Sequence, residues 1–160
     1  MRTLVVYYSL SGNTRKVAEA IAGSLSADLE EIVCDAYKPG FRGYLMAAYD
    51  VWRKKLPSIA APRHPVERYD LVVIGGPMWA GHIATPVASY LAAQAGKLRH
   101  VAFFLTHGGA PPEKVFLEMK TILGAVPKTI VAVREADVKA GAHAIPVSRF
   151  ADALRPYEAA

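Results

Sequence analysis

The sequence predicts an α/β fold: a doubly wound five-stranded parallel sheet with helices on both faces, in three layers. Four short segments are rich in β-branched and aromatic residues and are almost wholly apolar, as strands covered on both faces should be. Helix-like sequence follows each segment, and this alternation is typical of parallel βαβ units. The 160 residues suffice for a core of useful size. We therefore predict a single domain spanning residues 1–160, with an inserted helical segment at about 36–64.

Five segments account for the predicted strands. Leu29–Val33 is the most polar of them, so we place it at an edge of the sheet and expect the strand order 2-1-3-4-5. The other four strands are predicted at Thr3–Tyr8, Leu71–Ile74, Val101–Leu105 and Thr129–Val133.

The helices are predicted from apolar spacing and from proline positions. Val17, Ile21 and Leu25 recur at helical spacing and indicate a helix over Thr14–Leu25. Proline is common in the first turn of a helix, because its missing N–H has no helical partner there. Three later helices are expected to begin at Pro86, Pro112 and Pro146.

The connection Asp35–Pro65 is too long for a plain loop, and it contains a further predicted helix, Tyr44–Leu56. The basic run Arg53–Lys55 lies near the end of this helix. We expect its apolar face to pack onto the sheet or over a ligand, with a membrane surface or an acidic partner as the alternative. The residues of this face are Tyr44, Leu45, Ala48, Val51, Trp52 and Leu56.

Composition excludes several classes of function. The net charge of +5 is spread along the chain, so we expect no nucleic-acid partner. One cysteine, Cys34, cannot form an internal disulfide, and the N-terminus lacks the pattern of a secretory signal, so we expect a cytoplasmic protein. No apolar run reaches the ~20 residues of a membrane span. The histidines lack metal-ligand spacing, and no metal site is predicted.

Three glycine-containing loops follow the first, third and fourth of the five predicted strands. Parallel strands joined by right-handed crossovers present these loops at one edge of the sheet, where such folds bind ligands. The three loops are therefore expected to form one site. They are Ser9–Thr14, Gly75–His82 and Thr106–Gly109.

The first loop places small hydroxyl and amide side chains directly before a helix. Backbone N–H groups at a helix N-terminus favour an anion, and the loop lacks the motifs of triphosphate and dinucleotide sites, so a monophosphate fits better. The alternative is that Asn13 or Thr14 only caps the helix. Trp79 in the second loop offers a flat apolar surface suited to a planar heterocycle.

These loops resemble those of the flavodoxin-like family. Its Ser/Thr-x-Ser/Thr-Gly-x-Thr loop corresponds to Ser9–Thr14, and Gly76–Trp79 and Thr106–Gly109 are similar to its two later loops. The resemblance implies that the cofactor is flavin mononucleotide (FMN). By position, the phosphate would be held by Ser9, Leu10, Ser11, Gly12, Asn13 and Thr14. The isoalloxazine ring would be bordered by Pro77, Met78, Trp79, Ala80, Gly81, Thr106, His107, Gly108 and Gly109.

The resemblance implies a redox function without a required catalytic side chain. We expect an FMN-dependent oxidoreductase that takes electrons from NAD(P)H or a reductase and reduces a small acceptor such as a quinone. One alternative is a flavodoxin-type carrier whose acceptor is a protein, and another is a flavin-free regulatory protein on the same fold. From the net charge and from His82 and His107, we expect a positive environment around the ring. Related flavin reductases share their site across two subunits, so a homodimer is to be tested.

Overall fold

A computed structural model describes residues 1–157 and contains a twisted sheet in the order β2-β1-β3-β5-β6, with a short β4 paired to β3. All neighbours along this path are parallel, whereas β4 is antiparallel to β3. Counting the parallel strands alone, the order is the predicted 2-1-3-4-5, so the predicted fold class is confirmed. The strands are β1 Thr3–Tyr7, β2 Asp28–Glu31, β3 Leu71–Trp79, β4 His82–Ile83, β5 His100–His107 and β6 Ile130–Arg134.

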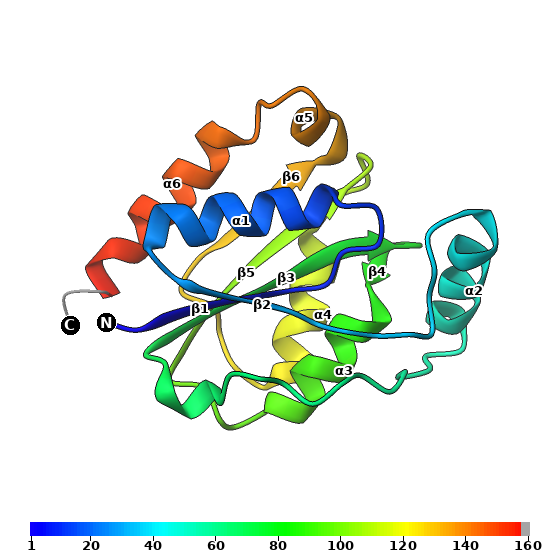
Figure 1. Cartoon of the computed structure of the whole chain (residues 1–160), viewed down its shortest axis with the longest axis horizontal. Helices are drawn as coiled ribbons and strands as arrows, with labels where there is room; N and C mark the ends of the chain where they lie inside the picture. Colours follow the sequence, from blue (N-terminus) through cyan, green and yellow to red (C-terminus); the bar gives the residue numbers. More distant parts are fainter. Residues whose placement is uncertain (158–160) are drawn as a thin grey trace.

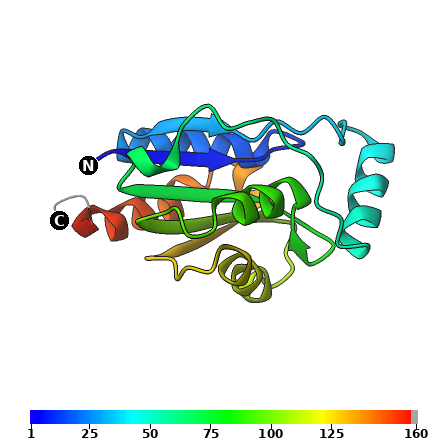
Figure 2. The same cartoon turned by 90° about the horizontal axis from the view of Figure 1, so that it is seen from below.

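Helices cover both faces of the sheet, giving three layers (Figures 1 and 2). Alternate residues of β1 point to opposite faces: Leu4 and Val6 join the core beneath α3 and α4, and Val5 and Tyr7 join the core beneath α1 and α6. The helices are α1 Asn13–Leu25, α2 Phe41–Trp52, α3 Thr85–Gln94, α4 Glu113–Leu123, α5 Glu135–Lys139 and α6 Ala144–Leu154.

The predicted helix starts agree with the structure to within a few residues. Pro86 is the second residue of α3, Pro112 directly precedes α4, and Pro146 is the third residue of α6. The short helix α5 and the strand β4 were not predicted from the sequence. Both are too short to produce a periodic pattern of apolar residues.

Two strands continue into segments that we expected to be loops. β3 runs through Trp79 and β5 through His107, so Gly75–Trp79 and Thr106–His107 are strand residues. Glycine and proline interrupt the sequence pattern of a strand, yet Gly75 pairs with Tyr7 and Phe104, and Pro77 pairs with Thr106. The second and third loops are consequently shorter than predicted.

The prediction for α2 is wrong in its boundaries and in its buried face. The helix begins and ends earlier than Tyr44–Leu56, and only Val51 of the predicted apolar face is buried. The buried face instead consists of Gly43, Ala47, Asp50 and Val51. The small residues Gly43 and Ala47 permit α2 to approach the rest of the protein closely. The Asp50 carboxylate accepts a hydrogen bond from the Tyr37 hydroxyl at 2.8 Å. Figure 2 shows α2 standing beyond the end of the sheet.

Cys34 follows β2 and is partly buried. Burial, reinforced by the carboxylates of Asp35 and Asp50, raises the pKa of its thiol. Because the thiolate is the reactive form, we expect iodoacetamide to alkylate Cys34 more slowly in the native protein than in urea. An equal or faster native rate, measured by mass spectrometry at mildly alkaline pH, would contradict the raised pKa of the Cys34 thiol.

Within residues 1–157, no helix has both the length and the apolar character needed to cross a bilayer. The same residues contain no grouping of histidine, cysteine and carboxylate side chains suited to a metal ion.

Candidate functional site

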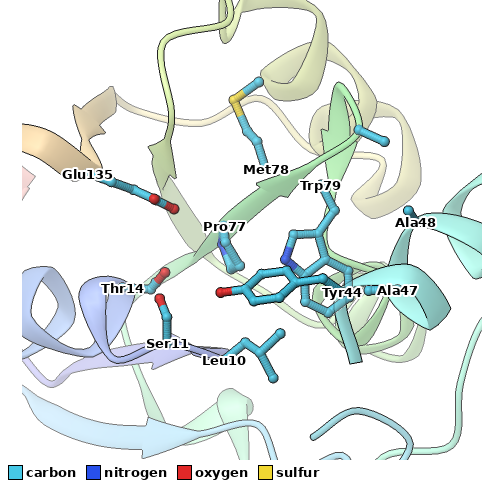
Figure 3. A pocket seen from close by; sticks show the side chains of 11 residues that line it. Leu10, Ser11, Thr14, Tyr44, Ala47, Ala48, Pro77, Met78, Trp79 and Glu135 are labelled. Carbon is cyan, nitrogen blue, oxygen red and sulfur yellow. The ribbon is translucent and has the colours of Figure 1, made fainter. Parts of the chain in front are cut away.

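A cavity of about 210 Å³ lies at the carboxyl edge of the sheet, among the loop that leads into α1, the end of β3, α2 and α5 (Figure 3). Ligands of doubly wound folds bind at this edge. Part of the first predicted loop forms one wall and the end of β3 forms another, while α2 covers the side away from the sheet. The lining residues are Leu10, Ser11, Thr14, Tyr44, Ala47, Ala48, Pro77, Met78, Trp79, Ala80 and Glu135.

The first loop leaves the start of α1 open to a ligand. The N-cap residue is Gly12, at φ 96°, and no side chain caps the helix. Ser9 Oγ accepts the Gly12 N–H at 3.0 Å, which holds the turn in place. Only glycine adopts this left-handed conformation without strain. The capping role considered for Asn13 and Thr14 is therefore wrong, and no side chain caps the first turn of α1, the kind of helix start that can bind an anion.

A buried hydrogen bond joins the first loop to β5. Thr14 Oγ1 and Thr106 Oγ1 lie 2.6 Å apart, and both side chains are almost completely buried. Neither residue can shift without breaking this contact. The bond thus fixes the N-terminus of α1 against the carboxyl end of β5.

The second loop is a tight β-hairpin. Ala80 and Gly81, at φ 49° and 79°, connect Trp79 to its partner His82 in a two-residue turn of type I′. Glu118 of α4 supports this hairpin from outside, because it accepts the Ile83 N–H at 3.0 Å and lies 3.2 Å from His82 Nδ1. The cavity wall formed by β3 is therefore rigid.

Trp79 is 7% exposed and lies within an aromatic cluster. Its ring meets Tyr8 and Tyr37 edge to face, with centroids 5.6 and 5.1 Å apart. Burial raises the pKa of Tyr37 to about 12, so its hydroxyl keeps the proton that it donates to Asp50. Figure 3 shows the nitrogen-bearing edge of Trp79 turned toward Pro77. Trp79 therefore lines the cavity from within an aromatic cluster that holds its ring in place.

Tyr44 of α2 is the principal site residue that sequence reasoning missed. We identified it only as part of an apolar helix face, but its ring lies across the cavity, with the hydroxyl directed toward Ser11 and Thr14 (Figure 3). The side chain is 49% exposed, so it forms the outer cover of the cavity. Its proximity to the first loop depends on where α2 lies, and a local sequence pattern contains no information on that placement.

The cavity lining carries no lysine, arginine or histidine, and its one ionisable carboxylate is Glu135. Arg15 lies near the cradle but bonds Glu31 at 2.8 and 3.0 Å. His107 is buried, and its Nδ1 accepts the Gly109 N–H at 3.1 Å. The positive environment that we expected around the ring is therefore absent from this lining. Backbone N–H groups and the α1 dipole remain to stabilise an anion.

The predicted binding residues divide into two groups. Leu10, Ser11 and Thr14 line the cavity, and Ser9, Gly12 and Asn13 complete their loop. The residues Pro77, Met78, Trp79 and Ala80 form the facing wall. By contrast, Gly81, Thr106, His107, Gly108 and Gly109 do not line this cavity, although Thr106 contacts it through Thr14.

Comparison with models of protein families identifies the family of the chain. Residues 2–135 match the family model described as Flavodoxin. The chain belongs to the flavodoxin family. The match ends at the start of α5 and includes every residue that lines the cavity. The family predicted from the three loops is thereby confirmed.

Solved structures of similar fold include flavoproteins from several bacteria. A flavoprotein from Lactobacillus acidophilus NCFM, crystallised in complex with FMN, is 26% identical, with a TM-score of 0.72 over 87% of this chain and 97% of that one. A flavoprotein from Bacteroides uniformis ATCC 8492 is 22% identical, with a TM-score of 0.72 over 94% and 97%. Flavodoxin 2 from Bacillus cereus is 22% identical, with a TM-score of 0.55 over 98% and 99%. A search of curated proteins returned no match.

Proposed function

We propose that this flavodoxin-family protein binds FMN, with the phosphate in the cradle at Ser9–Thr14 and the isoalloxazine ring between β3 and α2. The observation that carries the proposal is the uncapped N-terminus of α1, which opens into the same cavity as the apolar wall Pro77–Ala80. A monophosphate joined to a flat apolar ring matches this pair of surfaces. The similar protein from Lactobacillus acidophilus NCFM, in complex with FMN, supports the same cofactor.

FMN would supply the redox chemistry, and the protein would bind and orient it. The cradle would hold the phosphate through N–H groups at the start of α1, and the Thr14–Thr106 bond would keep that helix in register with the sheet. Ala47 and Ala48 would leave space for the ring, and Tyr44 would limit the access of water from the α2 side.

We propose an oxidoreductase that passes electrons from NAD(P)H, or from a reductase, to a small apolar acceptor such as a quinone. A second cavity of about 470 Å³ supports this assignment, because it shares the β3–β4 hairpin with the proposed flavin site. Its wall contains Gly81, His82 and Ile83 of the hairpin together with Leu56 and Leu117. An electron carrier that docks on proteins is the alternative, supported by membership of the flavodoxin family.

Steady-state kinetics separate these two functions. The purified protein, loaded with FMN, is mixed with NADH or NADPH and a soluble quinone, and nicotinamide oxidation is followed by absorbance. Turnover that requires both the quinone and bound FMN supports the oxidoreductase. A flavin that is reduced only after a reductase is added, with no quinone turnover, supports the carrier.

Tyr44→Ala is expected to weaken FMN binding and to increase the fluorescence of the bound flavin. An aromatic contact contributes about 0.5–1.5 kcal/mol, which corresponds to a rise in Kd of about two- to tenfold, and an electron-rich ring in contact with a flavin quenches its emission. Fluorescence titration of the apoprotein measures both effects. Tyr44→Phe is the matched control and should retain most of the quenching. Equal emission from Tyr44→Ala and the unmodified protein would place Tyr44 away from the ring.

A further inference from the structure

The outward side of α2 carries an unpartnered apolar stripe, defined here as Phe41, Leu45 and Trp52, none of which lines the candidate site. These residues recur at the spacing of one helical face, and all three are exposed. Phe41 and Trp52 are 79% and 80% exposed, values that are far from usual for such large apolar side chains. The stripe lies on the side of α2 opposite Gly43, Ala47 and Asp50, which face the protein.

The opposite side of α2 fixes this orientation. Asp50 is 6% exposed, and its carboxylate accepts the Tyr37 hydroxyl at 2.8 Å. The same hydroxyl lies 2.8 Å from Thr85 Oγ1, so the bond connects α2 to the start of α3. A rotation of α2 that buried Phe41 and Trp52 would break the hydrogen bond between Tyr37 and Asp50 and move the Asp50 carboxylate away from its partner. The apolar stripe is therefore presented outward by the fold itself.

Positive charge surrounds the stripe. The segment from Lys38 to Leu56 carries exposed basic residues at both ends of α2, and its one acidic residue is the buried Asp50. Arg53 lies over the Tyr49 ring, 5.5 Å from its centroid, so this cation sits directly beside the apolar side chains. The exposed basic residues are Lys38, Arg42, Arg53, Lys54 and Lys55.

We propose that α2 docks this protein on the surface of an anionic lipid bilayer, with Phe41 and Trp52 inserted at the headgroup boundary. A helix with aromatic and aliphatic residues on one side and flanking cations is suited to lie in the interface plane. Each lysine or arginine near an anionic surface adds to the attraction. Figures 1 and 2 show α2 at the extreme end of the molecule, where a flat surface can reach it without meeting another element.

A second copy of the chain fits this stripe less well. A two-fold interface uses the same surface on both subunits, so the five basic residues around one stripe would face those of the other. The segment offers no exposed carboxylate to neutralise them. Anionic lipid headgroups provide both the missing negative charge and an apolar layer for Phe41 and Trp52. This proposal does not depend on the proposed redox function.

Co-sedimentation with vesicles tests the proposal directly. The full-length protein is mixed with vesicles of phosphatidylcholine, or with vesicles in which phosphatidylglycerol replaces part of it. We expect binding to the anionic vesicles that weakens as salt is added. Phe41→Ser/Trp52→Ser and Lys54→Glu/Lys55→Glu should each reduce this binding by about tenfold or more.

Matched controls keep the test specific to α2. Val126→Ser/Ile145→Ser removes two exposed apolar residues elsewhere, and Lys97→Glu/Lys139→Glu reverses two exposed charges elsewhere. Both should bind vesicles more strongly than the α2 variants do, and circular dichroism should show all four variants folded.

Absence of vesicle binding, or equal losses in α2 and control variants, would overturn the proposal. A dimer in gel filtration that dissociates in Phe41→Ser/Trp52→Ser would assign the stripe to a second copy instead, and binding to polyglutamate without vesicle binding would assign it to an acidic protein.

Discussion

Ser11→Asp is expected to raise the Kd of FMN by about 100-fold or more. Ser11 is exposed in the loop before α1 and lines the proposed phosphate cradle, so the substitution adds a carboxylate beside the bound phosphate. Two unit charges about 4 Å apart interact by ~4 kcal/mol at an effective dielectric constant of about 20, and each 1.4 kcal/mol corresponds to about a tenfold change in Kd. The lining offers no cation to offset the repulsion. Calorimetric titration of the apoprotein with FMN measures the change.

Two controls separate charge from shape. Ser11→Asn has nearly the same size without the charge and should shift the Kd by about tenfold at most. Riboflavin lacks the phosphate, so its affinity should be similar for the unmodified protein and for Ser11→Asp. Equal weakening of FMN and riboflavin would show that the phosphate does not lie at Ser11.

Gly75→Ala is expected to reduce the free energy of unfolding by about 3 kcal/mol, at the upper end of the usual cost of overpacking a core. Gly75 lies in β3 between Tyr7 of β1 and Phe104 of β5. A Cβ at this position would collide with the ring and the backbone carbonyl of Phe104, which is completely buried. Because the carbonyl belongs to the adjacent strand, a change of rotamer cannot relieve the contact. Urea denaturation of the apoprotein measures the loss.

Gly23→Ala is the matched control for this substitution. Gly23 lies within α1, and a Cβ there meets no atom within 4 Å. Alanine is favoured over glycine inside a helix by about 0.5–1 kcal/mol, so this variant should be more stable than the unmodified protein. A similar loss of stability in both variants would contradict the explanation from strand packing.

The fold could be predicted because its sequence features are local. The apolar strands at Thr3–Tyr8 and Val101–Leu105, and the prolines near the helix starts, each reflect the geometry of their own segment. The strand order was predicted from the polar composition of Leu29–Val33, which favours an edge, together with the doubly wound architecture. The ends of β3 and β5 could not be predicted, because Gly75 and Pro77 are stabilised in the strand by pairing with distant segments.

The α2 region illustrates what a local pattern cannot determine. Its helix carries apolar residues on two sides, and periodicity alone does not indicate which side is buried. Contacts made over long sequence distances decide the question: Asp50 bonds Tyr37, and Tyr37 bonds Thr85. The same placement brings Tyr44 into the site, so the residue that covers the cavity could not be identified from sequence spacing.

Titration of the apoprotein with FMN and with riboflavin tests the central claim most directly. The account predicts saturable binding of one FMN per chain, a shifted flavin absorption spectrum, and distinctly weaker binding of riboflavin, because only FMN fills the cradle at the start of α1. A protein that binds neither flavin would contradict the assignment and would favour a flavin-free function on this fold. Equal affinities for FMN and riboflavin would contradict the role of Ser9–Thr14 as the phosphate site.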